Sequence, residues 1–252
     1  MNGIIEELRP VLASLKHPIV CFSGGYDSTA LLRNALEFCD DVTALLVELP
    51  MNTQRQIEYA KRIAEHLGAD LTVARLGWDD LEGIENNGPD RCYICKSAIF
   101  SLAKTIAINS PVLAGDNADD RDDDRPGHRA AKEKGIVNPL KEAGIGKSRI
   151  IKAVKELDLP FPMFKDTCMA TRYPIGYTIG EKEMRLAVDC EASVRKVSSL
   201  KQLRIRIDGD RALVQTDESE LPKMVRRRTQ ITYELKSRGL DCDLDLEPYK
   251  GQ

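Results

Sequence analysis

Residues 18–28 read Pro-Ile-Val-Cys-Phe-Ser-Gly-Gly-Tyr-Asp-Ser, an apolar run that ends in a serine and a glycine pair. The apolar run is typical of a short buried strand, and the glycines interrupt it before an amphipathic run over 28–38. When a strand is followed by a tight loop and then by the first turn of a helix, backbone N–H groups point at a common position that suits an anion. Ser23 and Ser28 add hydroxyl donors. We therefore predict that this loop binds the phosphates of a nucleotide.

The alternation of strand and helix continues on the C-terminal side of this loop. Apolar, β-rich runs over 42–49, 70–76 and 111–114 alternate with helical periodicity over 52–67 and 96–108. Such alternation predicts an α/β fold, in which a parallel sheet carries helices on both faces.

The C-terminal part of the chain has a different pattern. After a turn-rich connection we expect a helix, two strands and a further helix, over 181–197, 200–207, 211–215 and 221–238. This order predicts a smaller α+β domain. We place the boundary near residue 178, so the expected domains are a nucleotide-binding domain over 1–178 and a substrate-binding or oligomerisation domain over 179–252.

The composition is that of a globular chain, because 42% of its 252 residues are hydrophobic and 31% are charged. No apolar stretch is long enough to span a bilayer, and the first residues lack the basic start and apolar core of a signal peptide. We therefore expect a cytoplasmic protein without a membrane role. The net charge of -3 disfavours a nucleic-acid partner and favours a small substrate. In a reducing compartment the seven cysteines are not expected to form disulfides.

Three cysteines lie beside basic residues. Cys92 and Cys95 form a Cys-x-x-Cys, and Cys168 lies in another segment predicted as a loop. Three thiolates and a vacant position suit a [4Fe-4S] cluster with one open iron, which can hold a hydrosulfide as the attacking sulfur. Alternatively, Cys168 gives up its own sulfur, activated as a thiolate by Lys165 and Arg172, and the other two are structural. In a third interpretation all three are inert packing residues.

The string Ser-Gly-Gly-x-Asp-Ser over 23–28 resembles the PP-loop of the ATP-pyrophosphatase superfamily, which includes tRNA thiolases, GMP synthetase and asparagine synthetase. The resemblance implies that ATP is cleaved between its α and β phosphates and that pyrophosphate leaves into the loop. A nucleophile then displaces the resulting adenylate. Asp27 would repel phosphate by itself, so it fits this chemistry if Mg²⁺ is bound or if Asp27 orients the loop. A second glycine-rich string, which ends in Lys147 and Ser148, is interpreted as a helix start with a solvated lysine.

Further motifs are similar, in order and spacing, to those of the LarE family, and they lie at Asn117–Asp120, Asp124–Gly127, Asn138–Leu140, Cys168–Arg172 and Leu203–Arg206. LarE proteins are sulfur transferases of nickel-pincer nucleotide biosynthesis. They adenylate pyridinium-3,5-biscarboxylic acid mononucleotide and convert its carboxylates to thiocarboxylates. The chain departs from the family's Asp-Gly-Ser-Asn, which is here Ala-Gly-Asp-Asn over 114–117. A second departure is Cys-Met-Ala-Thr-Arg over 168–172, where the family has Cys-Leu-Ala-Ser-Arg.

The resemblance assigns roles in ATP binding and sulfur transfer. The ATP phosphates would be bound by Ser23, Gly24, Gly25, Asp27 and Ser28. Gly115 and Asn117 would lie near the AMP moiety. Cys168 matches the family's sulfur-site cysteine. Family members with cysteines at all three positions are expected to use a cluster, so Cys92, Cys95 and Cys168 favour the [4Fe-4S] alternative over loss of sulfur from the protein.

Candidate substrate ligands are basic, because a planar guanidinium matches a phosphate or a carboxylate with two hydrogen bonds. These candidates are Arg172, Arg204, Arg206, Lys96 and Arg125. Arg204 and Arg206 alternate on a predicted strand, so both are expected to face the same side. The family resemblance also implies a homo-oligomer, with a hexamer as the candidate assembly.

Three other functions use some of the same residues. A PP-loop tRNA thiolase would share the loop and the three-cysteine cluster, but it would need a basic groove or an RNA-binding appendage. An amide-forming enzyme of the superfamily would leave the three cysteines unexplained. A non-catalytic nucleotide-binding regulator would not release pyrophosphate from ATP when a carboxylate substrate is present.

Overall fold

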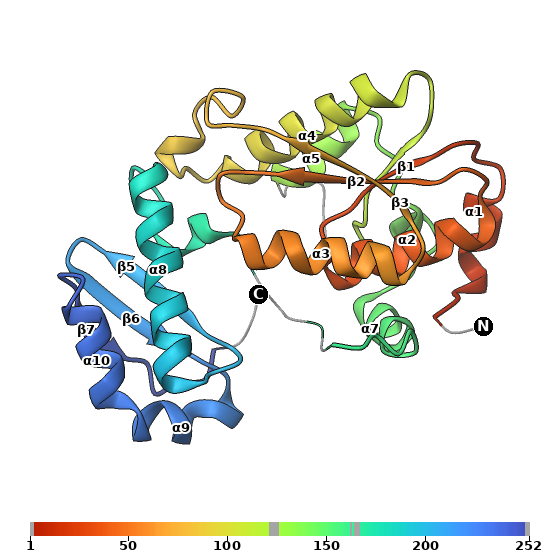
Figure 1. The fold of residues 1–252 in the computed structure, drawn as a ribbon. Coiled ribbons are helices and arrows are strands. Elements are labelled where there is room, and N and C mark those ends of the chain that lie inside the picture. Colours follow the sequence, from red (N-terminus) through yellow and green to blue (C-terminus); the bar gives the residue numbers. More distant parts are fainter. Residues whose placement is uncertain (1–2, 121–125, 162, 164–166, 250–252) are drawn as a thin grey trace. The chain divides into compact units, whose positions relative to one another are not determined.

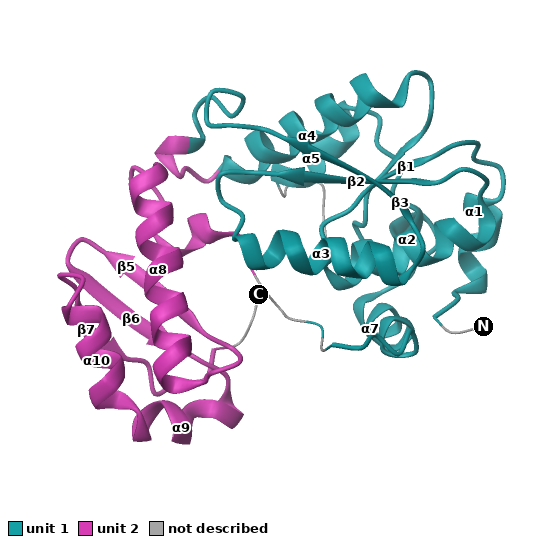
Figure 2. Cartoon of the chain, viewed as in Figure 1, with its two compact units in different colours: residues 1–84, 90–163 teal, residues 85–89, 164–252 magenta. Residues whose placement is uncertain are grey.

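The computed structural model describes residues 3–120, 126–161, 163 and 167–249 (Figure 1). The chain divides into two compact units (Figure 2). Unit 1 comprises Met1–Ile84 and Asp90–Met163, and unit 2 comprises Glu85–Pro89 and Phe164–Gln252. The domain boundary near residue 178 stays a prediction, because a compact unit is defined by its contacts and a domain by its ability to fold alone.

Unit 1 is built on a four-stranded parallel sheet in the order β3-β2-β1-β4. Its strands are β1 (Ile19–Cys21), β2 (Thr43–Glu48), β3 (Asp70–Arg75) and β4 (Val112–Leu113). Val20 of the central strand pairs with Ala44 of β2 on one side and with Leu113 of β4 on the other. Parallel strands need helical crossovers, so this sheet confirms the predicted α/β fold.

Helices cover both faces of this sheet, as predicted (Figure 1). One face carries α1 (Arg9–Leu12), α2 (Tyr26–Phe38), α3 (Gln54–His66) and α7 (Lys147–Lys155), and the other carries α4 (Arg91–Ala107) and α5 (Pro126–Glu133). A short helix α6 (Pro139–Glu142) and a 3-10 turn at Glu6–Leu8 complete the unit, and a second 3-10 turn at Ile84–Asn86 begins at the last residue of its first segment and continues into unit 2. Adjacent residues of β2 point to opposite faces, so Ala44 and Leu46 join the first core, and Leu45 and Val47 join the second.

The helix predicted from Lys96 begins earlier, at Arg91. The backbone carbonyl of Asp90 accepts hydrogen bonds from Tyr93 N at 2.8 Å and from Ile94 N at 3.1 Å, which closes the first turn. The β-branched and aromatic residues of this stretch have modest helix propensity, and packing of α4 on the sheet outweighs it. The Cys-x-x-Cys therefore lies within a helix.

Unit 2 contains a second, three-stranded sheet in the order β5-β6-β7. The strands are β5 (Arg204–Asp208), β6 (Arg211–Gln215) and β7 (Asp241–Leu244), with β5 and β6 antiparallel and β6 and β7 parallel. Its helices are α8 (Glu181–Ser198), α9 (Leu221–Arg226) and α10 (Arg228–Lys236), and 3-10 turns lie at Met169–Arg172 and Glu218–Glu220. The single helix predicted over 221–238 is interrupted at Arg227, and β7 was not predicted because aspartate is depleted in strands.

No helix within the described ranges combines the length and the apolar character that a membrane span requires.

Candidate functional site

The predicted phosphate loop connects β1 to α2. The helix begins directly after Gly25, and the first N–H groups of a helix have no partner within it, which favours a bound anion. Ser23 and Ser28 lie across the loop from each other, with their hydroxyl oxygens 3.2 Å apart. Ser28 Oγ also donates to the carbonyl of Gly25 at 3.2 Å. The loop thus has the closed shape and the donors that a pyrophosphate group requires.

Gly24 has to be a glycine for two separate reasons. Its φ of 74° lies in the left-handed region, which side chains disfavour. In addition, a Cβ at this position would lie 2.9 Å from both Cα and Cβ of Ala60 in α3. The loop is therefore pressed against a helix, and this contact fixes where its N–H groups point.

The loop lies at the point of the sheet where the strand order reverses. The chain runs from β1 outward to β2 and β3, and then returns to place β4 on the other side of β1. Gly115 follows β4, and a Cβ there would lie 3.1 Å from Ser28 N. Ligands of open parallel sheets bind at this reversal, outside the carboxyl ends of the strands. The structure thus brings Gly115 next to the phosphate loop.

A cavity of about 290 Å³ opens at the same place. Most of its wall is apolar and includes Leu45, Val47, Ile99 and Phe100, and the phosphate loop contributes a polar part. The predicted ligands Ser23, Gly25, Asp27, Ser28, Gly115 and Lys96 all line it. An apolar slot that leads into a polar, glycine-rich loop suits a nucleotide, whose base is planar and whose phosphates are charged.

Two side chains hold Asp27 of the loop. Asn117 Nδ2 donates to Asp27 Oδ1 at 3.2 Å, so the structure brings this predicted residue to the loop. Lys147 Nζ forms an ion pair with Asp27 Oδ2. The backbone N–H of Lys147 donates to Asp119 at 2.6 Å, which fixes the start of α7. The start of α7 was predicted from the sequence, but Lys147 was expected to be solvated. The one sequence signal for its ion pair was that Asp27, an aspartate in a phosphate loop, needs a cation nearby.

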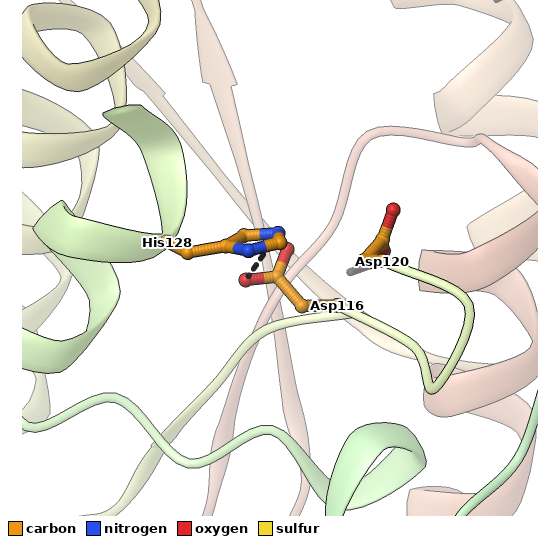
Figure 3. A group of neighbouring side chains, drawn as sticks. All are labelled: Asp116, Asp120 and His128. Atoms are coloured by element: carbon orange, nitrogen blue, oxygen red, sulfur yellow. Dashed lines mark ion pairs between the residues drawn. The ribbon is translucent and has the colours of Figure 1, made fainter. Parts of the chain in front are cut away.

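A group of candidate metal ligands lies beside the loop (Figure 3). One ligand atom from each of Asp116, Asp120 and His128 lies within 4.8 Å of the others. His128 Nε2 is 3.8 Å from Asp116 Oδ2, and Lys96 Nζ donates to Asp116 Oδ1 at 2.9 Å. The two carboxylates are hard oxygen ligands that fit Mg²⁺, whereas the imidazole is better suited to a transition metal. Asp116 and His128 were not predicted as ligands from the sequence.

The predicted sulfur-site cysteines belong to both units. Cys92 and Cys95 lie in the first turns of α4 in unit 1, where their spacing of three residues places them on the same side of the helix. Cys92 is exposed and Cys95 is half-buried. Cys168 is exposed and directly precedes the 3-10 turn at Met169–Arg172 in unit 2. Their joint role as cluster ligands stays a prediction.

Arg172 is almost fully buried within unit 2, with 1% of its surface exposed. Its Nε donates to Glu191 Oε1 at 2.6 Å, and its Nη1 donates to Thr167 Oγ1 at 2.7 Å. Glu191 is also buried and was not singled out from the sequence. The predicted role of Arg172 in substrate binding stays a prediction.

Arg204 and Arg206 differ in burial although they alternate on β5. Arg204 is buried, its guanidinium lies 4.3 Å from the ring centre of Tyr249, and its Nη2 contacts Thr167 Oγ1. Burial lowers the pKa of Arg204, and the charge of Arg172 adds to this effect. In the part of the chain that the structure describes, Arg204 Nε has no hydrogen-bond partner. Arg206 is exposed and donates to Gln215 at 2.9 Å.

Two predicted residues, Arg125 and Lys165, lie outside the described residues.

Comparisons with known proteins agree with this geometry. A family model described as "Queuosine biosynthesis protein QueC" matches residues 17–87, which include the phosphate loop. The pyridinium-3,5-bisthiocarboxylic acid mononucleotide synthase of Lactiplantibacillus plantarum is 30% identical over 96% of this chain and 90% of its own length. Uncharacterized proteins of Methanocaldococcus jannaschii and Synechocystis are 28% and 26% identical, over 93% and 99% of this chain and 91% and 96% of their own lengths. With its phosphate loop at the strand reversal and this likeness along nearly its whole length, the chain belongs to the LarE family of PP-loop proteins.

Proposed function

We propose that this chain is an ATP-dependent sulfur transferase. It adenylates the carboxylates of pyridinium-3,5-biscarboxylic acid mononucleotide and converts them to thiocarboxylates, in the biosynthesis of a nickel-pincer nucleotide. The observation that carries the proposal is the Ser23–Ser28 loop at the strand reversal, which faces a cavity suited to a nucleotide. The printed name of the Lactiplantibacillus plantarum relative supports the substrate, and Cys92, Cys95 and Cys168 support sulfur as the nucleophile.

The adenylation step is assigned to unit 1. ATP supplies the adenylyl group, and Mg²⁺ reduces the charge repulsion between its phosphates. Gly24 and Gly25 direct backbone N–H groups at the leaving pyrophosphate, and the N-terminus of α2 adds its dipole. Lys147 is held at the same loop by Asp27 and places a second positive charge beside the phosphates. The carboxylates of Asp116 and Asp120 would hold Mg²⁺.

The sulfur step is assigned to the three cysteines. They fit a [4Fe-4S] cluster in their chemistry, because two thiols share one side of α4 and Cys168 is exposed. When bound by Cys92, Cys95 and Cys168, the cluster would supply an iron site for a hydrosulfide. In the alternative, Cys168 donates its own sulfur.

Substrate binding is assigned to basic residues of both units. Arg204 and Arg206 lie on one strand, and Arg204 retains a buried Nε donor for an anionic group. Lys96 lines the nucleotide cavity, where it would accompany the carboxylate that is adenylated. Arg172 would act on the substrate through the loop that carries Cys168. The homo-oligomer and the cytoplasmic location stay predictions from the family resemblance and the sequence.

The test of the proposal separates its two chemical steps. The protein is purified without oxygen and assayed for iron and sulfide, and is then mixed with ATP, Mg²⁺ and the biscarboxylic mononucleotide for one turnover. Pyrophosphate release that depends on the mononucleotide reports adenylation, and mass spectrometry of the product reports sulfur transfer. The Cys168→Ser variant should keep the first signal and lose the second, whereas the matched control Cys242→Ser should keep both.

The origin of the sulfur follows from the same samples. About four irons per chain and an unchanged protein mass after turnover indicate the cluster. Loss of the elements of hydrogen sulfide at Cys168 indicates donation by the protein itself. If neither outcome is observed, the proposed sulfur transfer is contradicted. Pyrophosphate release without any thiocarboxylate product would contradict it as well.

A further inference from the structure

The loop that carries Cys168 has one exposed and one buried side. The Cys168 side chain is exposed, whereas Met169 and Ala170 directly after it are each only 1% exposed. The carbonyl of Cys168 accepts hydrogen bonds from Thr171 N at 3.0 Å and Thr171 Oγ1 at 2.7 Å. These bonds close the 3-10 turn. The position of the exposed sulfur therefore depends on whatever anchors the buried side of this turn.

Asn87, which lies far away in the sequence, anchors that side. Its side-chain amide donates to the backbone carbonyls of Ala170, Tyr173 and Pro174, at 3.3, 3.4 and 2.8 Å. Asn87 is fully buried, with 0% of its surface exposed. A buried carbonyl without a hydrogen-bond donor costs free energy. The Asn87 amide avoids this cost for several backbone carbonyls along the turn and the segment that follows it.

The backbone of Asn87 reinforces this anchor. Asn87 has a φ of 44°, in the left-handed region that asparagine tolerates better than most residues. Its carbonyl accepts from Gly176 N at 3.1 Å, and the carbonyl of Glu85 accepts from Ile179 N at 2.8 Å. The segment Glu85–Pro89 is thus tied to the chain after Cys168 at two further points, and both belong to unit 2. The conformation of Asn87 is what turns its amide toward the Cys168 loop.

We infer that Asn87 is a positioning residue for sulfur transfer, which holds the Cys168 loop in the geometry that the reaction needs. This inference rests on the proposed function, because it concerns the sulfur step of that reaction. Asn87 does not touch the nucleotide cavity of unit 1, so loss of its amide leaves adenylation intact. A displacement of the reacting sulfur by about 1 Å is enough to lower a rate about 10²-fold.

The test replaces Asn87 with glycine. Glycine adopts a positive φ without strain, so Asn87→Gly removes the amide and keeps the backbone conformation. The matched control is Asn109→Gly, because Asn109 has a φ of 74°, is exposed, and lies at the turn after α4. Both variants are assayed for mononucleotide-dependent pyrophosphate release, single-turnover sulfur transfer, thermal unfolding and amide hydrogen exchange.

The expected result is selective. Asn87→Gly should lower the single-turnover rate of sulfur transfer about 10²-fold. Pyrophosphate release should stay at the wild-type rate. Amide exchange should accelerate in the peptides over 168–179 and in the segment 85–89 that contacts them, and stay unchanged elsewhere. Asn109→Gly should change none of these measurements.

Three outcomes overturn the inference. They are an unchanged rate of sulfur transfer in Asn87→Gly, an unchanged exchange rate over 168–179, and an equal loss of both reaction steps together with general unfolding. If the wild-type protein itself makes no thiocarboxylate, the proposed function fails. Hydrogen exchange then still decides whether Asn87 anchors the Cys168 loop.

Discussion

Replacing Gly24 with alanine tests the close contact between the phosphate loop and α3. The new Cβ would lie 2.9 Å from Cα and Cβ of Ala60, atoms that a helix cannot easily move, and the φ of 74° disfavours any side chain. A left-handed alanine costs about 1–2 kcal/mol, and forcing an extra carbon into a packed contact costs about 1–3 kcal/mol. Gly24→Ala should therefore lower the free energy of unfolding by about 2–5 kcal/mol.

Gly68 offers a matched control. Its φ of 67° is nearly the same, but a Cβ at this position meets no atom within 4 Å. Gly68→Ala should therefore cost only about 1–2 kcal/mol. The free energy of unfolding of both variants is measured by urea unfolding, followed by the fluorescence of Trp78. Trp78 is the only tryptophan of the chain and lies in unit 1. Calorimetry with ATP at low urea then measures binding to the folded protein.

Two results would contradict the expected strain at Gly24 and its role in phosphate binding. An equal loss of stability in Gly24→Ala and Gly68→Ala would show that the contact with Ala60 carries no strain. Wild-type affinity for ATP in folded Gly24→Ala would show that the loop does not hold the phosphates.

Three further predictions concern charged and buried groups. Lys147→Met should lower the rate of pyrophosphate release about 10²-fold, because it removes a positive charge beside the phosphates, and the exposed Lys152→Met on the same helix should not. Glu191→Gln should lower the free energy of unfolding of unit 2 by about 3–5 kcal/mol, because it leaves the buried charge of Arg172 without a carboxylate. Urea unfolding measures this change, and a decrease of less than about 1 kcal/mol would contradict the prediction. Burial raises the pKa of Cys21 to about 12, so this thiol stays protonated at neutral and mildly alkaline pH. At about pH 8.5, iodoacetamide should therefore label Cys21 only after unfolding. Mass spectrometry of the labelled, folded protein measures this, and Cys21 among the first cysteines labelled would contradict the prediction.

Local patterns were sufficient to predict much of the fold. The apolar runs that became β1, β2, β3 and β4 are short, bounded by turn residues and spaced by helical periodicity, and each of these signals lies within a few residues. The phosphate loop was recognisable because its glycines and serines are adjacent in sequence. The start of α4 was not predicted, because its first turn contains residues with modest helix propensity and is stabilised by packing on the sheet.

The parallel α/β architecture, the PP-loop and the family could be predicted from the amino-acid sequence, because they depend on periodicity and on residues that are close together in the chain. Which distant residues contact one another became visible only in the folded chain. Lys147 forms an ion pair with Asp27, and Glu191 forms one with the buried Arg172. The side chain of Asn87 donates to a backbone carbonyl of the segment after Cys168. Such pairs form because packing brings donors to acceptors that burial has removed from water, and no local pattern records which partner a buried group will find.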